Sequence, residues 1–181
     1  GKKKILYSKG SKIREGLINQ LFSYHGLGDS SELIVSGGSA GGLAVLMGLD
    51  RIAEQVHKIA PDMRVLGLSD SPLFPDFTSG NSSFKLSKGT RGYDFLPDGF
   101  STDYSRGMRS MAVQTNAYLG SDKHCLDAFA PGGSNAQASC VFAQYLLAFI
   151  DSPLFVLQSR FDSWALVHVL GAHFDKDAVA E

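Results

Sequence analysis

The chain has 181 residues, of which 44% are hydrophobic and 19% charged, and its formal net charge is −1. This composition is that of a globular protein and excludes a disordered chain. The near-neutral charge favours neither nucleic acid nor an anionic membrane as a partner, and no apolar run reaches the roughly 18 residues of a membrane span. We therefore predict one domain over residues 1–181, acting as a monomer.

The first half of the chain predicts alternating strands and helices. Residues 4–10 form a short apolar run that ends at a glycine, as a strand does. Ser11 is a suitable N-cap for a helix that ends near Gly26. The residues expected to be buried on this helix are Ile13, Leu17, Leu21 and Phe22. A strand over 32–37, a helix of three- and four-residue periodicity, and a strand over 64–70 follow.

The second half predicts a long irregular segment and a strong final strand. Residues 71–104 are rich in Gly, Ser, Asp and Pro with scattered aromatic residues, which indicates a long irregular segment. A helix is predicted over about 105–119, and a shorter apolar helix near 141–149. The final strand is predicted within 152–164. Strands separated by helices favour an α/β domain with a mainly parallel sheet and flanking helices.

Residues 37–41, Gly-Gly-Ser-Ala-Gly, match the pattern G-x-S-x-G between a predicted strand and a predicted helix. In this context the pattern is typical of a nucleophile elbow, in which a serine occupies a strained strand-to-helix turn. Ser39 is therefore the candidate nucleophile, and the N–H of Ala40 is the candidate oxyanion donor at the helix N-terminus. A purely structural glycine turn is the alternative. A phosphate-binding loop fits poorly, because neither G-x-G-x-x-G nor a P-loop Lys-Ser/Thr is present.

A serine hydrolase also needs an acid and a base. Asp162 and Asp70 each follow a predicted strand at its carboxyl end, where active-site groups of open α/β sheets collect. Each is alternatively a surface carboxylate or a helix cap. We favour Asp162, because the acid of an α/β-hydrolase typically follows a strand well after the nucleophile. Only His168 and His173 fit the chain order of a base, and both read more simply as surface or packing residues, so no convincing base is found.

Three blocks in order resemble the pectin acetylesterase/Notum family of carboxylesterases: "LIVSGGSAGGLAVLMGLDRIAE", "VLGLSDSPLF" and "CVFAQYLLAFIDSPLFVLQSRFDSW". The resemblance runs from about Lys4 to about Val167. It implies an α/β-hydrolase fold in which Ser39 is the nucleophile, Ala40 the oxyanion residue and Asp162 the acid. In such a fold, residues 71–104 would form a loop-rich cap above the active site.

Two parts of the family pattern are unmatched in these 181 residues. The family's catalytic histidine falls several dozen residues beyond the acid, and its glycine-rich "GGGW" oxyanion segment lies on an early strand. We therefore expect an incomplete, central portion of the family's domain, without the oxyanion strand and the histidine segment. The resemblance further implies a secreted or extracellular protein and a disulfide between Cys125 and Cys140.

These inferences predict a serine carboxylesterase that needs no cofactor and no metal. Because family members remove short acyl groups from polysaccharides or a fatty acyl group from a signalling protein, the expected partner is an acylated carbohydrate, such as acetylated pectin, or an acylated protein. Two alternatives stay open. One is a catalytically inactive or truncated homologue that binds glycan or acyl groups, and the other is an α/β domain that binds phosphate at the turn 37–42.

Overall fold

The computed structural model describes residues 9–77, 93–95, 100–169 and 172–174. Its strands are β1 (Glu32–Gly38), β2 (Arg64–Asp70), β3 (Tyr93–Phe95), β4 (Leu154–Leu157) and β5 (Ala172–Phe174). Its helices are α1 (Gly10–Tyr24), α2 (Ala40–His57), α3 (Phe100–Gln114), α4 (Lys123–Phe129), α5 (Gly133–Gln137), α6 (Ala143–Leu146) and α7 (Ser163–His168). Short 3₁₀ turns cover Leu27–Asp29, Ala117–Gly120, Ala130–Gly132, Ala138–Val141 and Leu147–Phe149.

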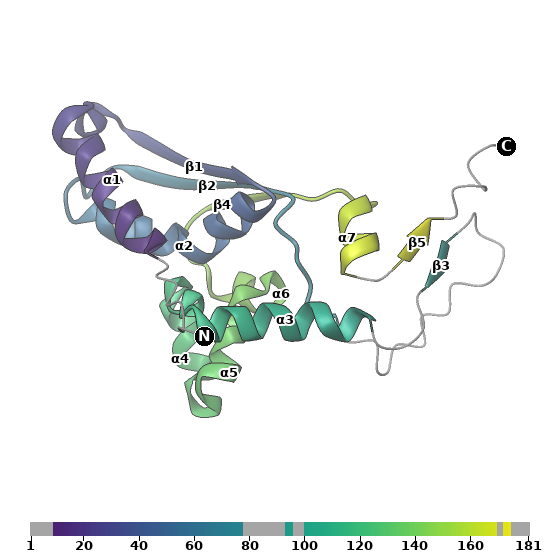
Figure 1. Ribbon diagram of the computed structural model, residues 1–181. Helices are drawn as coiled ribbons and strands as arrows, with labels where there is room; N and C mark the ends of the chain where they lie inside the picture. Colours follow the sequence, from purple (N-terminus) through teal and green to yellow (C-terminus); the bar gives the residue numbers. More distant parts are fainter. Residues whose placement is uncertain (1–8, 78–92, 96–99, 170–171, 175–181) are drawn as a thin grey trace, which may run out of the picture.

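Three parallel strands form the main sheet in the order β1, β2, β4 (Figure 1). The register pairs Gly38 with Asp70 and Asp70 with Leu157, so the three strands end at the same level. Strands β3 and β5 pair antiparallel in a separate two-stranded sheet. The predicted α/β class with a mainly parallel sheet is confirmed, and the predicted strands 32–37 and 64–70 correspond to β1 and β2.

Helix α2 is the centre of the packing and lies below the sheet in Figure 1. On its sheet side, Leu49, Ile52 and Val56 join a buried cluster with Val65 of β2. Leu46 belongs to a second buried cluster, formed with residues 112–146. Full burial of a leucine or valine side chain stabilises a fold by about 1.5 to 3 kcal/mol, and both faces of α2 gain from it. Helix α2 is therefore held in place from two sides.

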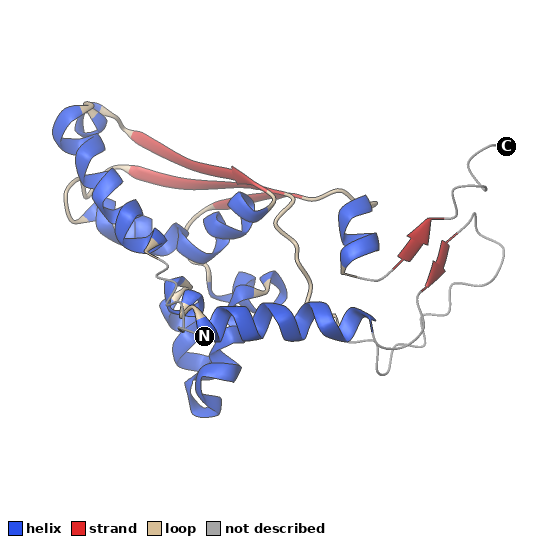
Figure 2. Ribbon diagram, viewed as in Figure 1, coloured by secondary structure: helices blue, strands red, loops and turns tan. Residues whose placement is uncertain are grey.

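The other face of the main sheet carries exposed apolar side chains. The exposed fractions are 60% for Ile34, 37% for Leu68, 62% for Phe155 and 46% for Leu157. In Figure 2 the helices packed against the sheet lie on the α2 side, and none of the described helices covers the opposite face. Parallel sheets usually have both faces covered by helices. In the described residues, helices cover only the face that packs on α2.

Helix α1 differs from its prediction in its start and in the face that it buries. It begins at Gly10 with Lys9 in the N-cap position, so Ser11 lies inside the helix and is not the cap. Its one buried residue is Ile18, whereas Ile13 and Leu17 are 69% and 53% exposed. The reason is that α1 packs against α2 along a narrow stripe and contributes little to the sheet core. The strand predicted over 4–10 falls mainly outside the described residues.

The later elements are shorter than predicted or shifted along the chain. Helix α3 starts five residues before the predicted 105–119 and ends at Gln114, because Asn116 adopts a left-handed conformation with φ 55°. The helix predicted near 141–149 is broken at Phe142, whose backbone is extended. Of the segment 152–164, the four residues of β4 form a strand. Much of the predicted cap, residues 78–92 and 96–99, lies outside the described residues.

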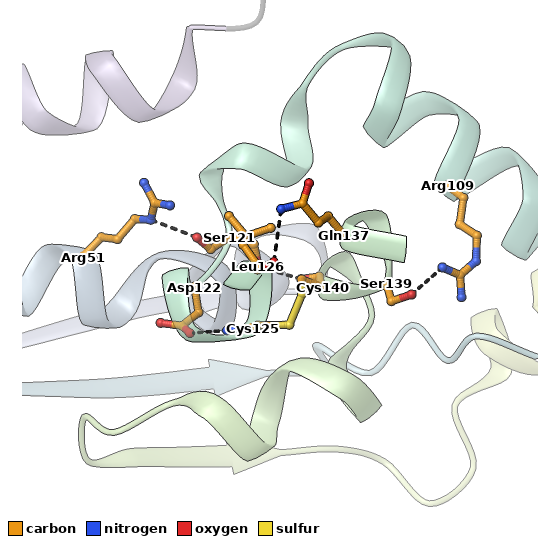
Figure 3. Close-up of a disulfide and its surroundings, with 9 residues drawn as sticks. All are labelled: Arg51, Arg109, Ser121, Asp122, Cys125, Leu126, Gln137, Ser139 and Cys140. Carbon is orange, nitrogen blue, oxygen red and sulfur yellow. Dashed lines mark hydrogen bonds between the residues drawn. A yellow bond between two sulfur atoms is a disulfide. The ribbon is translucent and has the colours of Figure 1, made fainter. Parts of the chain in front are cut away.

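A disulfide joins Cys125 of α4 to Cys140 in the 3₁₀ turn Ala138–Val141, the pairing that the family resemblance implied (Figure 3). Both cysteines are fully buried. The surrounding hydrogen bonds close the same loop: Asp122 accepts the N–H of Cys125 at 3.0 Å, and the Ser121 hydroxyl donates to the carbonyl of Cys140 at 2.6 Å. The disulfide therefore fixes the helical layer that packs against α2.

We expect a Cys125→Ala/Cys140→Ala double variant to lose about 3 kcal/mol of unfolding free energy, because a closed loop of about 15 residues restricts the unfolded chain by that amount. Urea denaturation of oxidised wild type and variant measures the difference. Reducing agent should lower the unfolding free energy of the wild type toward that of the variant, and it should leave the unfolding free energy of the variant unchanged. A variant as stable as the oxidised wild type would show that the disulfide contributes nothing.

Candidate active site

The carboxyl ends of the three parallel strands bring three polar residues to one edge of the sheet. Ser39, Ser71 and Gln158 directly follow β1, β2 and β4. The N–H of Ser39 donates to the carbonyl of Asp70 at 2.8 Å, and the N–H of Ser71 donates to the carbonyl of Leu157 at 2.7 Å. The strand ladder thus continues for one residue beyond the ends of β1 and β2 before the chain turns away.

Ser39 occupies a strained strand-to-helix turn. Its backbone angles are φ 54° and ψ −121°, which a residue with a side chain rarely adopts. Such a conformation costs of order 1 to 3 kcal/mol and persists where the surrounding structure enforces it. The residue is exposed, and its side chain does not cap α2, although serine is a favoured capping residue. The hydroxyl is therefore presented to solvent at the edge of the sheet.

Two glycines allow the first turn of α2 to touch the strand ends. A Cβ atom added at Gly37 would collide with the carbonyl of Gly41, lying 2.5 Å from its carbon. A Cβ atom at Gly42 would lie 2.6 Å from the carbonyl oxygen of Asp70. The buried Ser69 hydroxyl donates to the carbonyl of Gly42 at 2.8 Å and fastens the same contact. Backbone contact at this point forces the sharp turn at Ser39.

The N-terminus of α2 supplies backbone donors next to Ser39. The N–H of Leu43 makes the first hydrogen bond of the helix, to the carbonyl of Ser39 at 3.0 Å. The preceding N–H groups, that of Ala40 among them, have no acceptor within the helix. These groups and the helix dipole favour negative charge beside the turn. The N–H of Ser39 is already bonded to Asp70, so the donor that follows the serine is that of Ala40.

Asp162 lies at the same edge and is held by three N–H donors. Its Oδ1 accepts the N–H groups of Trp164 and Ala165, each at 3.0 Å, and so caps α7. Its Oδ2 accepts the side-chain N–H of Gln158 at 2.9 Å, while Gln158 Oε1 accepts the N–H of Leu73 at 3.1 Å. The helix-cap role considered in the sequence analysis is thus present, and the carboxylate is firmly oriented.

Asp70, the other candidate acid, borders the serine turn itself. Its backbone carbonyl accepts the N–H of Ser39, and its exposed Oδ1 accepts the hydroxyl of Ser71 at 2.9 Å. Ser71 has a positive φ of 52°, like Ser39. Neither Ser71 nor Gln158 is among the site residues predicted from the sequence. The available signal for Gln158 was its position four residues before Asp162, an aspartate that follows a strand. No sequence signal marks Ser71.

An aromatic cluster lies beside Asp162. Phe74 and Tyr104 pack edgewise on Trp164, with ring centroids 5.4 and 6.2 Å away, and the His168 ring lies 4.8 Å from the same indole. Burial raises the pKa of Tyr104 to about 12, so its phenol stays protonated at neutral pH and is unsuited to act as a base.

The structure does not bring a described histidine side chain to the candidate acids. His168 is exposed and stacks on Trp164 without a hydrogen bond to Asp162. His173 is paired in register with Asp94 in the small sheet, and its side chain lies outside the described part. Among the residues that the structure describes, no histidine is hydrogen-bonded to Ser39 or Asp162.

Ser39 is exposed. Two of the cavities formed by described residues have volumes of about 480 and 510 Å³, and neither is lined by Ser39 or Asp162. Within the described ranges, no group of three or more His, Cys, Asp or Glu side chains is placed to hold a metal ion. Over the same ranges, every helix is too short or too polar to cross a membrane.

A parallel sheet with flanking helices, and a strained serine between a strand and the helix that packs beneath it, define an α/β-hydrolase-like fold. The sequence comparison narrows this class to one family. The profile described as Pectinacetylesterase matches residues 1–178, and the chain belongs to this family.

Two relatives illustrate the breadth of the family. The chain is 29% identical to the human palmitoleoyl-protein carboxylesterase NOTUM over 167 residues, which are 90% of this chain and 30% of that protein. It is 27% identical to pectin acetylesterase 5 of Arabidopsis thaliana over 166 residues, 91% of this chain and 32% of that protein. The chain therefore spans about a third of the length of the curated relatives that it matches.

The glycine contact under the serine turn is testable by a matched pair of substitutions. Gly37→Ala places a methyl group against the backbone of Gly41, and we expect a loss of about 1 to 3 kcal/mol of unfolding free energy. Gly38→Ala meets no atom within 4 Å and should change stability little. Chemical denaturation compares the two variants. Equal stabilities would show that close approach of α2 to β1 does not govern the turn.

Proposed function

We propose that this chain carries the nucleophile and the acid of a serine carboxylesterase. The observation that carries the proposal is Ser39 itself, held at φ 54° on a strand-to-helix turn with an exposed hydroxyl that does not cap α2. A serine in this geometry beside a helix N-terminus fits nucleophilic attack on an ester. Membership of the pectinacetylesterase family supports the same reaction.

The proposed reaction proceeds through an acyl-enzyme. The Ser39 hydroxyl attacks the ester carbonyl and loses its proton to a histidine, the C–O bond to the leaving alcohol breaks, and the histidine returns the proton to that alcohol. The histidine then takes a proton from water, which attacks the acyl-serine carbonyl. The C–O bond to Ser39 breaks, the carboxylic acid product leaves, and the histidine returns the proton to the Ser39 oxygen. The N–H of Ala40 stabilises the oxyanion in both steps. Asp162 orients the histidine, which we expect to come from outside the described residues.

The proposed substrate is an ester of an acyl group on a large acceptor. The names of the two relatives describe one that acts on palmitoleoyl-protein and one on acetyl groups of pectin. An O-acetylated polysaccharide such as pectin, or another O-acylated carbohydrate or protein, is the substrate class that we propose. The open position of Ser39 supports access of a large acceptor. The buried disulfide supports an oxidising, secreted environment.

One observation favours a second candidate, an inactive homologue that binds glycan or acyl groups. Both oxygens of Asp162 are occupied by N–H donors of α7 and Gln158, and no described histidine contacts them. A carboxylate oxygen can accept more than one hydrogen bond. The carboxylate of Asp162 can therefore accept a further hydrogen bond from a histidine, as the active enzyme requires. Activity of the natural protein therefore decides between the two candidates.

In the full natural protein, Ser39→Ala should abolish hydrolysis of p-nitrophenyl acetate, because no alkoxide can form at the turn. Ser36→Ala is the matched control and should leave the rate unchanged. Ser36 is an exposed serine in β1, the strand that leads into the turn, three residues before Ser39. The isolated 181-residue chain should react barely above background. Wild-type protein without activity on p-nitrophenyl acetate or acetylated pectin would favour the inactive homologue.

The choice of acid is tested by two isosteric substitutions in the same protein. Asp162→Asn should lower kcat by about 10⁴-fold, because an amide favours the wrong tautomer of the histidine. Asp70→Asn should lower kcat much less, because the contact of Asp70 with Ser39 is made by its backbone carbonyl. The reverse order of effects would assign the acid to Asp70.

A further inference from the structure

Gln158 joins the candidate acid to a segment far away in the chain. It directly follows β4, and Asp162 lies four residues later, at the start of α7. The side-chain N–H of Gln158 donates to Oδ2 of Asp162 at 2.9 Å, and its Oε1 accepts the backbone N–H of Leu73 at 3.1 Å. Both hydrogen bonds are partly buried, which strengthens them relative to bonds in open water.

The contact with Leu73 fixes the orientation of the Gln158 amide. A backbone N–H only donates, so it requires the amide oxygen of Gln158 and not its NH₂ group. With the oxygen turned toward Leu73, the NH₂ group faces Asp162. A flipped amide would oppose two donors at Leu73 and two acceptors at Asp162. The direction of the hydrogen bond to Asp162 is therefore set by the segment that follows β2.

That segment is itself held by the helical layer. The side chain of Asp76 is 7% exposed, and its carboxylate pairs with Arg109 and accepts the hydroxyl of Tyr145 at 2.9 Å. The backbone of Asp76 bonds to Gln144, whose Oε1 accepts the N–H at 2.7 Å and whose Nε2 donates to the carbonyl at 3.4 Å. Leu73, three residues earlier, is thus a well-anchored reference point for the Gln158 amide.

The two oxygens of Asp162 differ in their remaining capacity to accept hydrogen bonds. Oδ1 accepts the N–H groups of Trp164 and Ala165, each at 3.0 Å, which occupy its two lone pairs. Oδ2 accepts one N–H from the described residues, that of Gln158, so one lone pair stays open. A histidine oriented by Asp162 would therefore bond to Oδ2, beside the Gln158 amide.

We propose that Gln158 is a positioning residue of the esterase, which fixes Oδ2 of Asp162 in the direction that the catalytic histidine requires. This role of Gln158 rests on the function proposed for Ser39 and Asp162. A neutral amide donor orients the carboxylate and leaves its negative charge in place. That charge stabilises the histidinium that forms when Ser39 attacks the ester. Gln158 acts through Asp162 and transfers no proton.

Gln158→Glu in the full natural protein tests this role, with hydrolysis of p-nitrophenyl acetate as the readout. The substitution keeps an oxygen for the N–H of Leu73 and replaces the NH₂ group that faces Asp162 by a second oxygen. We expect kcat/KM to fall about 10²-fold, because a displaced carboxylate misaligns the histidine. The acidic limb of the pH profile should move to higher pH, because the added negative charge raises the pKa of the histidine.

Two leucine variants separate positioning from anchoring of the segment. Gln158→Leu loses both hydrogen bonds, and its kcat/KM should fall about tenfold or more with the acidic limb unmoved, since no charge is added. Gln144→Leu is the matched control, because it also loses two hydrogen bonds to the same segment, both of them to the backbone of Asp76. It should keep kcat/KM within about twofold of wild type.

A role of Gln158 in anchoring Leu73 alone would leave Gln158→Glu with the wild-type rate and pH profile, and that result would overturn the proposal. Equal losses in Gln144→Leu and Gln158→Leu would also overturn it. Ser39→Ala separates these outcomes from failure of the proposed function. Hydrolysis that does not depend on Ser39 would overturn that function and the role of Gln158 with it, whereas hydrolysis that depends on Ser39 but not on Gln158 would overturn the role of Gln158 alone.

Discussion

Direct backbone contact between the start of α2 and the ends of β1 and β2 is the constraint on which the structure depends. Gly37 and Gly42 lack the side chains that would separate these segments, and Ser69 bonds across the same junction. A chain that passes from strand to helix in so little space must reverse direction within one residue. That residue is Ser39, and its strained backbone exposes the hydroxyl beside free N–H groups of the helix.

The two buried clusters on either side of α2 explain why this strain is tolerated. The helix buries Leu49 and Val56 under the sheet and Leu46 against the layer that contains the disulfide. Each of these side chains contributes on the order of 1.5 to 3 kcal/mol, so together they exceed the cost of one strained residue. The helix is thus anchored along its length, and the turn at its start follows from that anchoring.

The sequence predicted best the parts of the fold that local pattern determines. The apolar runs of β1 and β2 and the glycine-flanked serine follow from steric rules, so their positions agree with the structure. Tertiary contacts determined the features that differ from the prediction. Helix α1 buries Ile18 rather than Ile13 because its neighbour is α2, and the break at Phe142 reflects packing around the disulfide.

The hydrogen-bonding partners of the candidate site were beyond sequence reasoning for the same reason. Gln158 reaches both Asp162 and the N–H of Leu73, a residue far away in the chain, and only the fold brings the two segments together. Residue types at a strand end can be predicted, whereas contacts across the chain require the structure.

The central claim is that Ser39 is the nucleophile, and covalent trapping tests it most directly. The full natural protein is treated with a fluorophosphonate, which reacts with activated serine hydroxyls, and its peptides are mapped by mass spectrometry. We predict one stoichiometric adduct on the peptide that contains Ser39, and no adduct in denatured protein. An unlabelled protein that hydrolyses esters, or an adduct at Ser71 or another serine, would contradict it.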